Sequence, residues 1–569
     1  MVRANEAAAA ALEEYADLFA ISGGDPFRVR SYQKAAKAIS GFPDDISRTD
    51  VRVVPGVGVA IAKKVEEFLQ RGSFRQLDDL RARVPQGVRR LTRIATLGPK
   101  TAYFLFQELG IDSPDALAEA IRAGRLTGLR GFGPKTEANL LKGIEQLQRT
   151  GTRVHLGAAT PLAEKILASL PADRAAIAGS LRRMKETVGD IDILATAADP
   201  AGLMAEFRRQ PYVLEVIASG DRKTSVLAAP GIQVDLRVVP PESWGAAMQY
   251  FTGSKEHNVR LREICVKRGW KLSEYGLFEG ERVIAADSEE EIYAALGMAW
   301  VPPPLREASG EIEAALRGEL PDLVTLADIK GDLHTHTNLT DGVADLETMV
   351  AEAARRGYAY YAVTDHAPKL VMQRMTLEKA LAQRARLCRL QAVHPDVLLL
   401  HGTELNIAPD GTVDWDGEVL AGFDVCVASV HSHFTQSRDE MTRRFIAACE
   451  NPWVHIIGHP TTRKIGKRPP VDADWDAIFQ AAARTGTALE INAYPDRADL
   501  PSELVRRAHH HGVRFSIDSD SHAVPHLDNL RFGVGIAQRA WLTADDVINT
   551  WPPDRLLAFL RRSASRPPG

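Results

Sequence analysis

The residues best suited to chemistry in this 569-residue sequence are carboxylates in its middle and histidines towards its C-terminal end. The stretch VGDIDILAT is typical of a strand, where side chains alternate faces, so Asp190 and Asp192 point one way while Ile191 faces the core. A third acid, Asp235, lies in a second predicted strand, IQVDLRVV. If these strands are neighbours, the three carboxylates can hold two Mg²⁺ or Mn²⁺ ions about 3.5–4 Å apart, an arrangement suited to in-line attack at phosphorus.

A Gly-Ser turn precedes the paired acids. Gly179 and Ser180 end a short apolar run and open a predicted helix, SLRRMKE. Backbone N–H groups at such a turn, with Arg182 and Arg183 beside them, are suited to phosphate oxygens. Two acids on a strand by themselves more often form a solvated face. Together with the turn and the later acid, however, they predict a triphosphate site beside a metal pair.

Fourteen of the sixteen histidines lie beyond residue 326, and several follow short apolar strand candidates that alternate with amphipathic segments. This alternation predicts a β/α fold, and in a barrel of parallel strands the C-terminal strand ends form one rim. A single histidine after a strand is more often a satisfied core residue. Six or more in the same relation predict a site for Zn²⁺, Mn²⁺ or Fe²⁺, and the number of ligands implies two or three ions.

The length and composition limit the class of protein. Hydrophobic residues make up 45% and charged residues 25% of the chain, which argues against a largely disordered or fibrous protein. One hydrophobic core stops growing near about 250–300 residues, so we expect several domains. The four cysteines form no CxxC pair, and a secretory signal and an apolar run of about 20 residues are both lacking. We therefore expect a reducing, cytoplasmic location and no membrane partner.

The first 150 residues form the basic part of a chain whose net charge is −4. Three Gly-containing turns there each precede an amphipathic helix, as in helix-hairpin-helix units that offer N–H groups to DNA phosphates. A single such turn often only connects packed helices, but three in one basic block favour DNA binding. The turn glycines and the lysines that follow them are Gly56, Gly58, Lys63, Lys64, Gly98, Lys100, Gly133 and Lys135.

The segment GSLRRMKETVGDIDIL resembles the nucleotidyltransferase signature of family X DNA polymerases, and YFTGSKEHNVRLR is similar to their nucleotide-selecting thumb segment. The resemblance covers roughly the first half of the chain. It implies that Asp190, Asp192 and Asp235 bind the catalytic metals and that Asp235 accepts the proton of the primer hydroxyl. It further implies nucleotide contacts by Gly179, Ser180, Arg183, Gly189, Tyr250, Phe251, Gly253, Asn258 and Arg262.

One position departs from that family. Members that remove a 5′ deoxyribose phosphate use a lysine shortly after the first hairpin, and in RGSFRQLDDL the matching residue is Leu77. An alkyl chain cannot act as the amine nucleophile. We therefore do not expect lyase activity unless Lys63 or Lys64 substitutes, and we assign Lys34 to contact with a 5′ phosphate.

The C-terminal motifs HTHT, TDH, GTE, SVHSH, GHP and DSH are similar to the polymerase and histidinol phosphatase (PHP) domain, a distorted β/α barrel with a trinuclear metal centre. The resemblance implies 3′→5′ exonuclease action, with cleavage at abasic sites as a further option. The basic segment TTRKIGKRPP either holds DNA near the site or is only a loop. The implied ligands are His334, His336, Asp341, His366, Glu404, His431, His459, Asp520 and His522.

Together these observations predict a multidomain α+β chain with a helical helix-hairpin-helix region, a nucleotidyltransferase palm and thumb, and a C-terminal barrel. The expected divisions are 1–85 (DNA-end binding), 86–150 (fingers-like), 151–240 (palm), 241–300 (thumb), 301–325 (linker) and 326–569 (barrel). We expect a monomeric, nucleoid-associated polymerase that fills short gaps in DNA repair, including base excision repair. Its partners would be gapped or nicked DNA and dNTPs. The expected ions are Mg²⁺ or Mn²⁺ in the palm and two or three Mn²⁺ or Zn²⁺ in the barrel.

Two alternatives remain open at this point. One is a phosphatase for small phosphoesters with a degenerate polymerase half, and the other is a DNA-end-binding scaffold whose barrel metals are structural.

Overall fold

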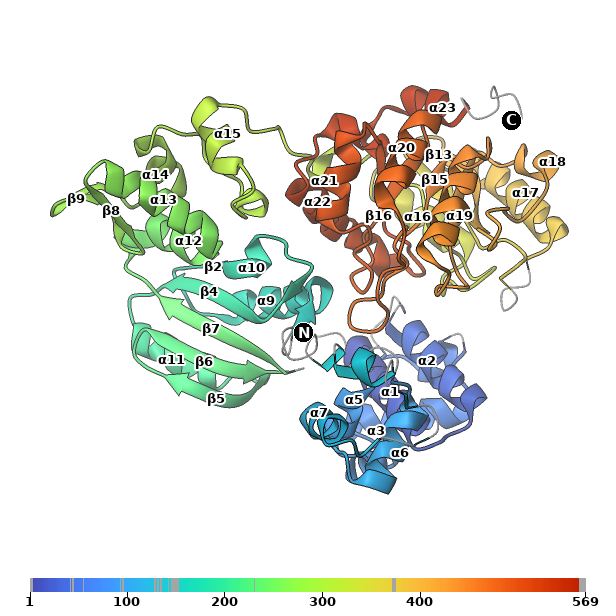
Figure 1. Cartoon of the computed structure of the whole chain (residues 1–569), viewed down its shortest axis with the longest axis horizontal. Helices are drawn as coiled ribbons and strands as arrows, with labels where there is room; N and C mark the ends of the chain where they lie inside the picture. The colour runs from blue at the N-terminus through green and yellow to red at the C-terminus, as the bar shows by residue number, and fades with distance from the viewer. Residues whose placement is uncertain are drawn as a thin grey trace.

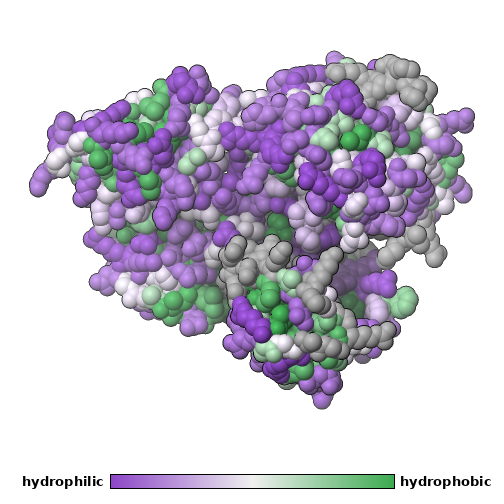
Figure 2. All heavy atoms as spheres, in the orientation of Figure 1, coloured by the Kyte–Doolittle hydropathy of each residue, from purple (hydrophilic) through white to green (hydrophobic). Residues whose placement is uncertain are grey.

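The computed structural model describes residues 4–561 except for positions 41, 43–45, 55, 93, 95, 96, 127, 128, 130, 131, 134, 135, 142, 145–152, 230 and 371–374. Figure 1 shows the palm and thumb regions on one side, the barrel on the other, and the N-terminal helices below the barrel. Figure 2 shows a mainly hydrophilic face that is hollowed between the N-terminal helices and the barrel. Within the described residues, none of the helices is both long enough and apolar enough to cross a bilayer.

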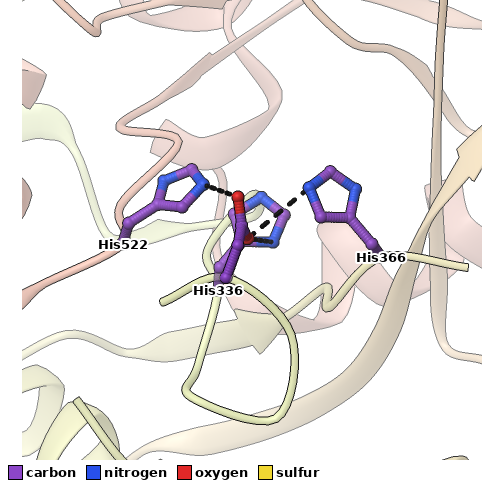
Figure 3. A group of neighbouring side chains, drawn as sticks. His336, His366 and His522 are labelled. Carbon is purple, nitrogen blue, oxygen red and sulfur yellow. Dashed lines mark hydrogen bonds and ion pairs between the residues drawn. The ribbon is translucent and has the colours of Figure 1, made fainter. Parts of the chain in front are cut away.

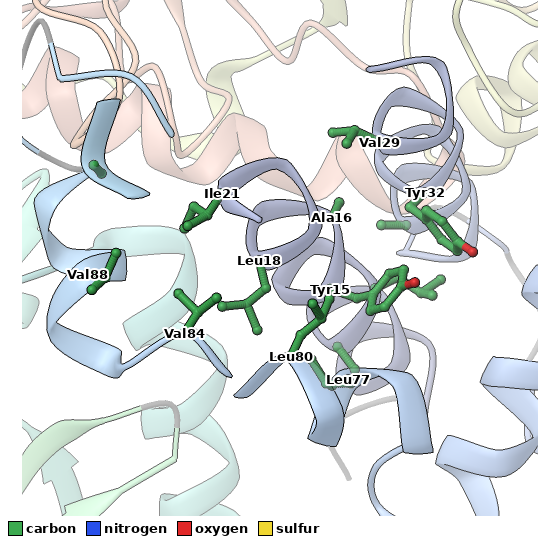
Figure 4. Packing of buried hydrophobic residues seen from close by; sticks show 14 of the residues in the cluster. Tyr15, Ala16, Leu18, Ile21, Val29, Tyr32, Leu77, Leu80, Val84 and Val88 are labelled. Atoms are coloured by element: carbon green, nitrogen blue, oxygen red, sulfur yellow. The ribbon is translucent and has the colours of Figure 1, made fainter. Parts of the chain in front are cut away.

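The N-terminal helices pack round one core, part of which is drawn in Figure 4. Tyr15 of α1 meets Tyr32 of α2 edge-on, with 4.7 Å between ring centroids, and Leu77 of α4 is fully buried beneath α1. The same buried cluster extends from Ala8 to Ile144, on both sides of the division predicted near residue 85. The elements are α1 (Ala4–Ile21), α2 (Pro26–Ser40), η1 (Val51–Val53), α3 (Val59–Arg71), α4 (Arg75–Arg83), α5 (Gln86–Leu91), α6 (Pro99–Leu109) and α7 (Pro114–Arg122).

The palm region is a five-stranded sheet with strand order β2-β4-β7-β6-β5, in which β4 and β7 are parallel and the other neighbours are antiparallel. The apolar residues of β4, such as Ile191 and Ile193, pack under α9 and α11. The opposite face of β4 carries Asp190 and Asp192 and then the apolar Leu194, which packs against Trp244 and Met248. The elements are β1 (Val154–His155), α9 (Leu156–Ser169), β2 (Arg174–Ile177), α10 (Gly179–Arg182), β3 (Thr187–Val188), β4 (Asp190–Thr196), α11 (Pro200–Arg208), β5 (Val213–Ser219), β6 (Lys223–Ala228) and β7 (Ile232–Val238).

The thumb region joins helices to a small antiparallel sheet of order β10-β9-β8. The segment predicted as a linker contains α15, whose Ile312 and Ala315 belong to the same core as Leu261 and Ile292. The elements are η2 (Pro241–Ser243), α12 (Trp244–Thr252), α13 (Lys255–Lys267), β8 (Trp270–Ser273), β9 (Gly276–Glu279), β10 (Arg282–Ala285), α14 (Glu289–Ala295), η3 (Pro303–Leu305) and α15 (Glu311–Arg317).

The C-terminal region is a nearly closed barrel of seven parallel strands in chain order, as the alternating pattern predicts. An isolated parallel bridge between Thr335 and Ser521 joins the first and last strands at the rim. The strands are β11 (Gly331–Asp332), β12 (Tyr360–Val363), β13 (Leu398–Asn406), β14 (Val425–Ser429), β15 (Ile456–Ile457), β16 (Ala488–Asn492) and β17 (Phe515–Asp518). The helices are η4 (Leu326–Asp328), α16 (Leu346–Arg355), α17 (Leu377–Val393), α18 (Gly417–Leu420), α19 (Arg438–Glu450), α20 (Trp475–Thr485), α21 (Ser502–His510), η5 (Val524–Asn529), α22 (Leu530–Arg539), η6 (Ala544–Asp546), η7 (Ile548–Thr550) and α23 (Pro553–Arg561).

Candidate active sites in the palm and the barrel

The three acids predicted in the palm lie on adjacent strands. Asp190 and Asp192 are on β4, and Asp235 is on β7. The parallel pairing of the strands sets Asp192 directly opposite Asp235, so these two carboxylates emerge side by side. Because Asp190 is two residues from Asp192, it emerges on the same face. The fold therefore brings the acids together on the side of the sheet away from α9 and α11.

The three clustered carboxylates repel one another, and a bound cation would relieve that repulsion. Burial, followed by the charges of Asp190 and Asp235, raises the pKa of Asp192 to about 7. Burial alone would raise the pKa of Asp235 too, but hydrogen bonds from neighbouring side chains outweigh it and lower that pKa. One of those neighbours is Lys223, whose Nζ lies 3.1 Å from Oδ2 of Asp235. A divalent ion would offset the remaining repulsion, and carboxylate oxygens fit Mg²⁺ or Mn²⁺.

Gly179 supports Asp192 directly. Its φ is +62°, in the left-handed region that glycine tolerates best. A Cβ at this position would lie under 3.0 Å from Oδ2 of Asp192, so the turn and the metal-ligand candidate fit together only without a side chain. The predicted turn thus holds the backbone N–H groups of α10 beside the carboxylates.

The two arginines after this turn have carboxylate partners. Arg182 forms a two-pronged ion pair with Glu289, at 2.9 and 2.7 Å. Arg183 donates from Nε to Oε1 of Glu307 at 2.9 Å and from Nη1 to the carbonyl of Thr252 at 2.5 Å. Phosphate contacts were expected from both residues. The structure instead places Arg182 in a pair with the thumb, while Nη2 of Arg183 makes no hydrogen bond within the described part of the chain.

The predicted thumb residues surround the end of α12. Tyr250 and Phe251 are half-buried and meet edge-on at 5.1 Å, and Arg237 of β7 stacks over Phe251. Asn258 is buried and uses both side-chain polar atoms internally: Oδ1 accepts from Gln249 at 2.7 Å, and Nδ2 donates to a backbone carbonyl.

The other predicted nucleotide contacts differ in exposure. Arg262 on α13 is exposed. Gly253 has a φ of +69° and approaches the guanidinium of Arg183, because a Cβ at that glycine would lie 3.2 Å from Nη1. Gly189 precedes β4, and Ser180 lies in α10.

All nine predicted barrel ligands converge on the rim formed by the strand ends. In the described part of the chain, three groups of side chains gather ligand atoms within 4.8 Å of one another, and all three are in the barrel. Figure 3 shows His336, His366 and His522 pointing toward one another. The groups are His336, Asp341, His366 and His522; His334, His336 and Asp520; and His366, Glu404 and His431. Nε2 of the remaining ligand, His459, lies 3.0 Å from Oε1 of Glu404.

The donor set fits metal ions. Nε2 of His334 and Nε2 of His336 lie 3.2 Å apart, although both rings are fully buried. Burial, followed by the charge of His522, lowers the pKa of His336 to about 4. That ring is therefore neutral near pH 7, which is the form that binds metal. Imidazole and carboxylate donors without thiolate suit Zn²⁺, Mn²⁺ or Fe²⁺.

Several residues that orient these ligands were missed by sequence reasoning. Nδ1 of His334 donates to Glu490 at 2.6 Å, and Nδ1 of His431 donates to Oδ1 of Asn406 at 2.7 Å. Such contacts fix the tautomer and aim the other nitrogen at the metal. Nε of Arg497 lies 3.3 Å from Oδ2 of Asp520, which adds a cation beside the ligands. The available signal was residue type, since Glu490 is an acid within the apolar strand β16, as Glu404 is within β13.

The predicted helix-hairpin-helix turns begin helices as expected. Gly58 and Gly98 are the N-caps of α3 and α6, and the carbonyl of Gly133 accepts from the N–H of Glu137 at 3.0 Å. Gly56 has a φ of +81°. The lysines Lys34, Lys63 and Lys100 are exposed, whereas Lys135 lies outside the described residues.

The lyase question depends on two side chains. Leu77 is fully buried in the N-terminal core, so it supplies neither an amine nor access. Lys64 is half-buried, with its Nζ 5.8 Å above the ring of Tyr15 and 6.0 Å from that of Phe74.

The basic segment after His459 makes mostly internal contacts. Arg463 pairs with Glu186 of the palm at 2.9 Å, and Arg468 stacks over Phe434 at 4.0 Å. Lys467 remains exposed. The histidine run at the end of α21 contacts acids, because His509 reaches Asp546 and His511 reaches Asp476.

Comparisons with known proteins match successive parts of the chain. A helix-hairpin-helix domain matches residues 3–74, and a SAM-like helix-hairpin-helix tandem matches 88–146. A DNA polymerase beta thumb matches 247–307, and a PHP domain matches 332–494.

Whole proteins give the same picture. A DNA polymerase/3′-5′ exonuclease PolX of Bacillus subtilis (strain 168) is 35% identical over 562 residues, which are 97% of this chain and 98% of that relative. DNA polymerase lambda of Rattus norvegicus is 26% identical over 50% of this chain and 53% of its own length. A probable phosphatase of Syntrophotalea carbinolica is 30% identical over 38% of this chain and 90% of its own length.

Proposed function

This chain belongs to the bacterial family X DNA polymerases that carry a C-terminal PHP domain, and on that premise we propose which of its residues perform each reaction. The protein is a gap-filling DNA polymerase with a 3′→5′ exonuclease, and both activities depend on metal ions. The phosphatase and scaffold alternatives are not favoured, because the relative that matches nearly the whole chain is a polymerase and exonuclease.

The side-by-side placement of Asp192 and Asp235 is the observation that supports the palm assignment. Asp190, Asp192 and Asp235 hold two divalent ions, Mg²⁺ or Mn²⁺, and Asp235 accepts the proton of the primer 3′ hydroxyl. For that role Asp235 has to part from Lys223, which now lies 3.1 Å away. Ions bound at such sites act as Lewis acids that stabilise charge on phosphate oxygens and activate the attacking oxygen.

The incoming nucleotide lies across the turn at the start of α10. Backbone N–H groups of Ser180 and its neighbours bind phosphate oxygens, with Gly179 and Gly189 leaving room for them. Nη2 of Arg183 donates a charge-assisted hydrogen bond to a phosphate oxygen of the nucleotide. Tyr250, Phe251 and Gly253 border the sugar and base, whereas Asn258 and Arg262 face the minor-groove side of the new pair. Asn258 has to exchange its internal bonds to do so.

The barrel cleaves the phosphodiester at a 3′ end. Its nine ligands would hold two or three ions, Mn²⁺ or Zn²⁺, within the three ligand groups, which share His336 and His366. Arg497, beside Asp520, donates to a non-bridging phosphate oxygen and so orients the scissile group. Cleavage at abasic sites is a second reaction open to the same groups.

The partners follow from these sites. Gapped or nicked DNA lies along the helix-hairpin-helix turns, with Lys34 at the 5′ phosphate and Gly58, Gly98 and Lys100 at the backbone. We further propose that the protein acts as a monomer and associates with the nucleoid.

The decisive test separates the two reactions in one molecule. Substituting Asp190 and Asp192 by alanine is expected to abolish nucleotide addition on one-nucleotide-gapped DNA and to spare degradation of a 3′-labelled strand. Substituting His334 and His336 is expected to do the reverse, with folding checked by circular dichroism. Synthesis that persists in the first variant would refute the palm assignment, and 3′ degradation that persists in the second would refute the barrel assignment.

A further inference from the structure

The four residues that follow α10, Arg183 to Glu186, are held from outside the palm. The carbonyl of Arg183 accepts a hydrogen bond from Nη1 of Arg539 in α22 of the barrel, at 3.0 Å. The same Nη1 lies 2.9 Å from Oε1 of Glu307, in the segment between thumb and barrel. Glu307 in turn accepts from Nε of Arg183. Backbone and side chain of Arg183 are thus tied to one arginine of the other catalytic domain.

The next residues of this loop make barrel or junction contacts as well. Met184 has a φ of 56° and lies against Gly535 of α22, where a Cβ would come under 3.0 Å from Met184. Nζ of Lys185 lies 3.1 Å from Oε2 of Glu307. Glu186 pairs with Arg463 of the barrel at 2.9 Å. Every residue of the loop is therefore constrained by the barrel or by Glu307.

Helix α22 is itself anchored in the palm. Phe532 is 4% exposed and belongs to the hydrophobic cluster formed by α9, α11 and the palm sheet. Arg531 pairs with Glu164 of α9 at 2.7 Å. Because α22 buries apolar surface against the palm, its position relative to the palm is fixed, and so are the contacts that Arg539 makes.

The charges at the junction favour an anion at Arg183. Three cations, Arg183, Lys185 and Arg539, face one carboxylate, that of Glu307. The side chains of Arg183 and Arg539 are only 11% and 9% exposed, so solvent screens this cluster weakly. Because Glu307 also pairs with Arg539, it offsets the positive charge of Arg183 only in part, and Arg183 can still attract an anionic ligand. Without Arg539, Glu307 would neutralise Arg183 more completely.

We propose that Arg539 is a positioning residue for nucleotide addition: through Glu307 and the Arg183 carbonyl, the barrel sets the orientation and charge of the guanidinium that receives the triphosphate. The inference rests on the proposed role of Arg183. A guanidinium already held by Glu307 and the Thr252 carbonyl loses less freedom when phosphate binds. The barrel would then serve synthesis as well as degradation.

The test uses the full chain on one-nucleotide-gapped DNA, with kcat and KM for the dNTP measured separately. Arg539→Ala is expected to raise KM for the dNTP about 10-fold with kcat changed less than about threefold, since binding and not the reacting groups is altered. Arg539→Lys is expected to restore part of the loss. The same preparations are assayed for 3′ degradation, which is expected to stay at the wild-type rate because Arg539 is not among the barrel ligands.

Arg531→Ala is the matched control, since it removes another ion pair of α22 without touching the loop. It is expected to leave KM unchanged. Misfolding of Arg539→Ala would appear as a loss of 3′ degradation. In that case Arg539→Gln, which keeps most of the buried aliphatic side chain, is used instead, and the same rise in KM is expected.

Two outcomes separate this inference from the function on which it rests. If Arg183→Ala leaves KM for the dNTP unaltered, the proposed role of Arg183 is wrong. If Arg183→Ala raises KM and a folded Arg539 variant does not, only the positioning role is wrong. A role through Arg183 also requires that Arg539→Ala add little in the Arg183→Ala background, whereas fully additive effects would overturn it.

Discussion

Replacing Gly179 by alanine is expected to stop nucleotide addition while leaving 3′ degradation intact. With a φ of +62°, alanine at this position is strained by about 1–2 kcal/mol. Its Cβ would also lie under 3.0 Å from Oδ2 of Asp192 and 3.1 Å from Cγ, whereas ordinary contacts begin near 3.4 Å. The carboxylate oxygen must therefore move by roughly 1 Å, because the packed turn cannot retreat. A misplacement on the order of 1 Å in a catalytic group costs about 100-fold in rate.

The assay is single-nucleotide incorporation on gapped DNA, with 3′ degradation measured on the same preparation. Gly269→Ala in the thumb is the matched control, because Gly269 has a φ of +72° but nothing within 4 Å of a Cβ. Both variants should lose similar stability, and only Gly179→Ala should lose synthesis. If Gly179→Ala incorporates nucleotide within about threefold of the control, the contact with Asp192 does not set the geometry of the site and the reasoning fails.

Three further predictions concern the barrel, the thumb and the junction. Glu490→Gln is expected to weaken Mn²⁺ binding about 10- to 100-fold, because the carboxylate that accepts from His334 becomes a neutral amide, a weaker acceptor; calorimetric titration showing unchanged affinity would contradict this. Although burial alone raises the pKa of Glu289, Arg306 and Arg182 outweigh it and lower the pKa from 4.5 to about 2. Glu289 therefore contributes about 3 kcal/mol to the free energy of unfolding above pH 4.5, and this contribution is lost as the pH falls towards 2. In Glu289→Gln the free energy of unfolding, measured with urea, should change less with pH across that range. An unchanged pH dependence would count against the pairing. Phe532→Ala should lower the free energy of the first unfolding transition by about 3–5 kcal/mol, because it removes a large side chain from the palm core. A decrease of less than about 1 kcal/mol would show that α22 is not packed into that core.

Much of both sites was predictable from short-range spacing. The alternation of VGDIDILAT placed Asp190 and Asp192 on one face, and the structure has them there. The recurrence of histidine after apolar strands predicted a metal site at one rim, the resemblance to the PHP domain implied its nine ligands, and the ligand groups form at that rim. Strand alternation and strand-end position are local geometric properties, so residue type and spacing suffice to predict them.

Pairings between distant segments were not predictable in this way. The sequence offered Arg182 and Arg183 as phosphate ligands, but in the fold Glu289 and Glu307 meet them. Nothing in the spacing of Glu490 indicated His334, and nothing in α22 indicated that Arg539 would reach the loop after α10.

The sequence by itself thus determined the chemical types, their local faces and the order of the domains. Only the tertiary structure decided that Asp235 lies opposite Asp192, which cation faces which carboxylate, and that Arg539 of the barrel contacts the loop after α10. The reason is physical: local geometry follows from backbone periodicity, whereas the partner of a buried charge is whichever group the packing of remote elements brings within a few ångströms.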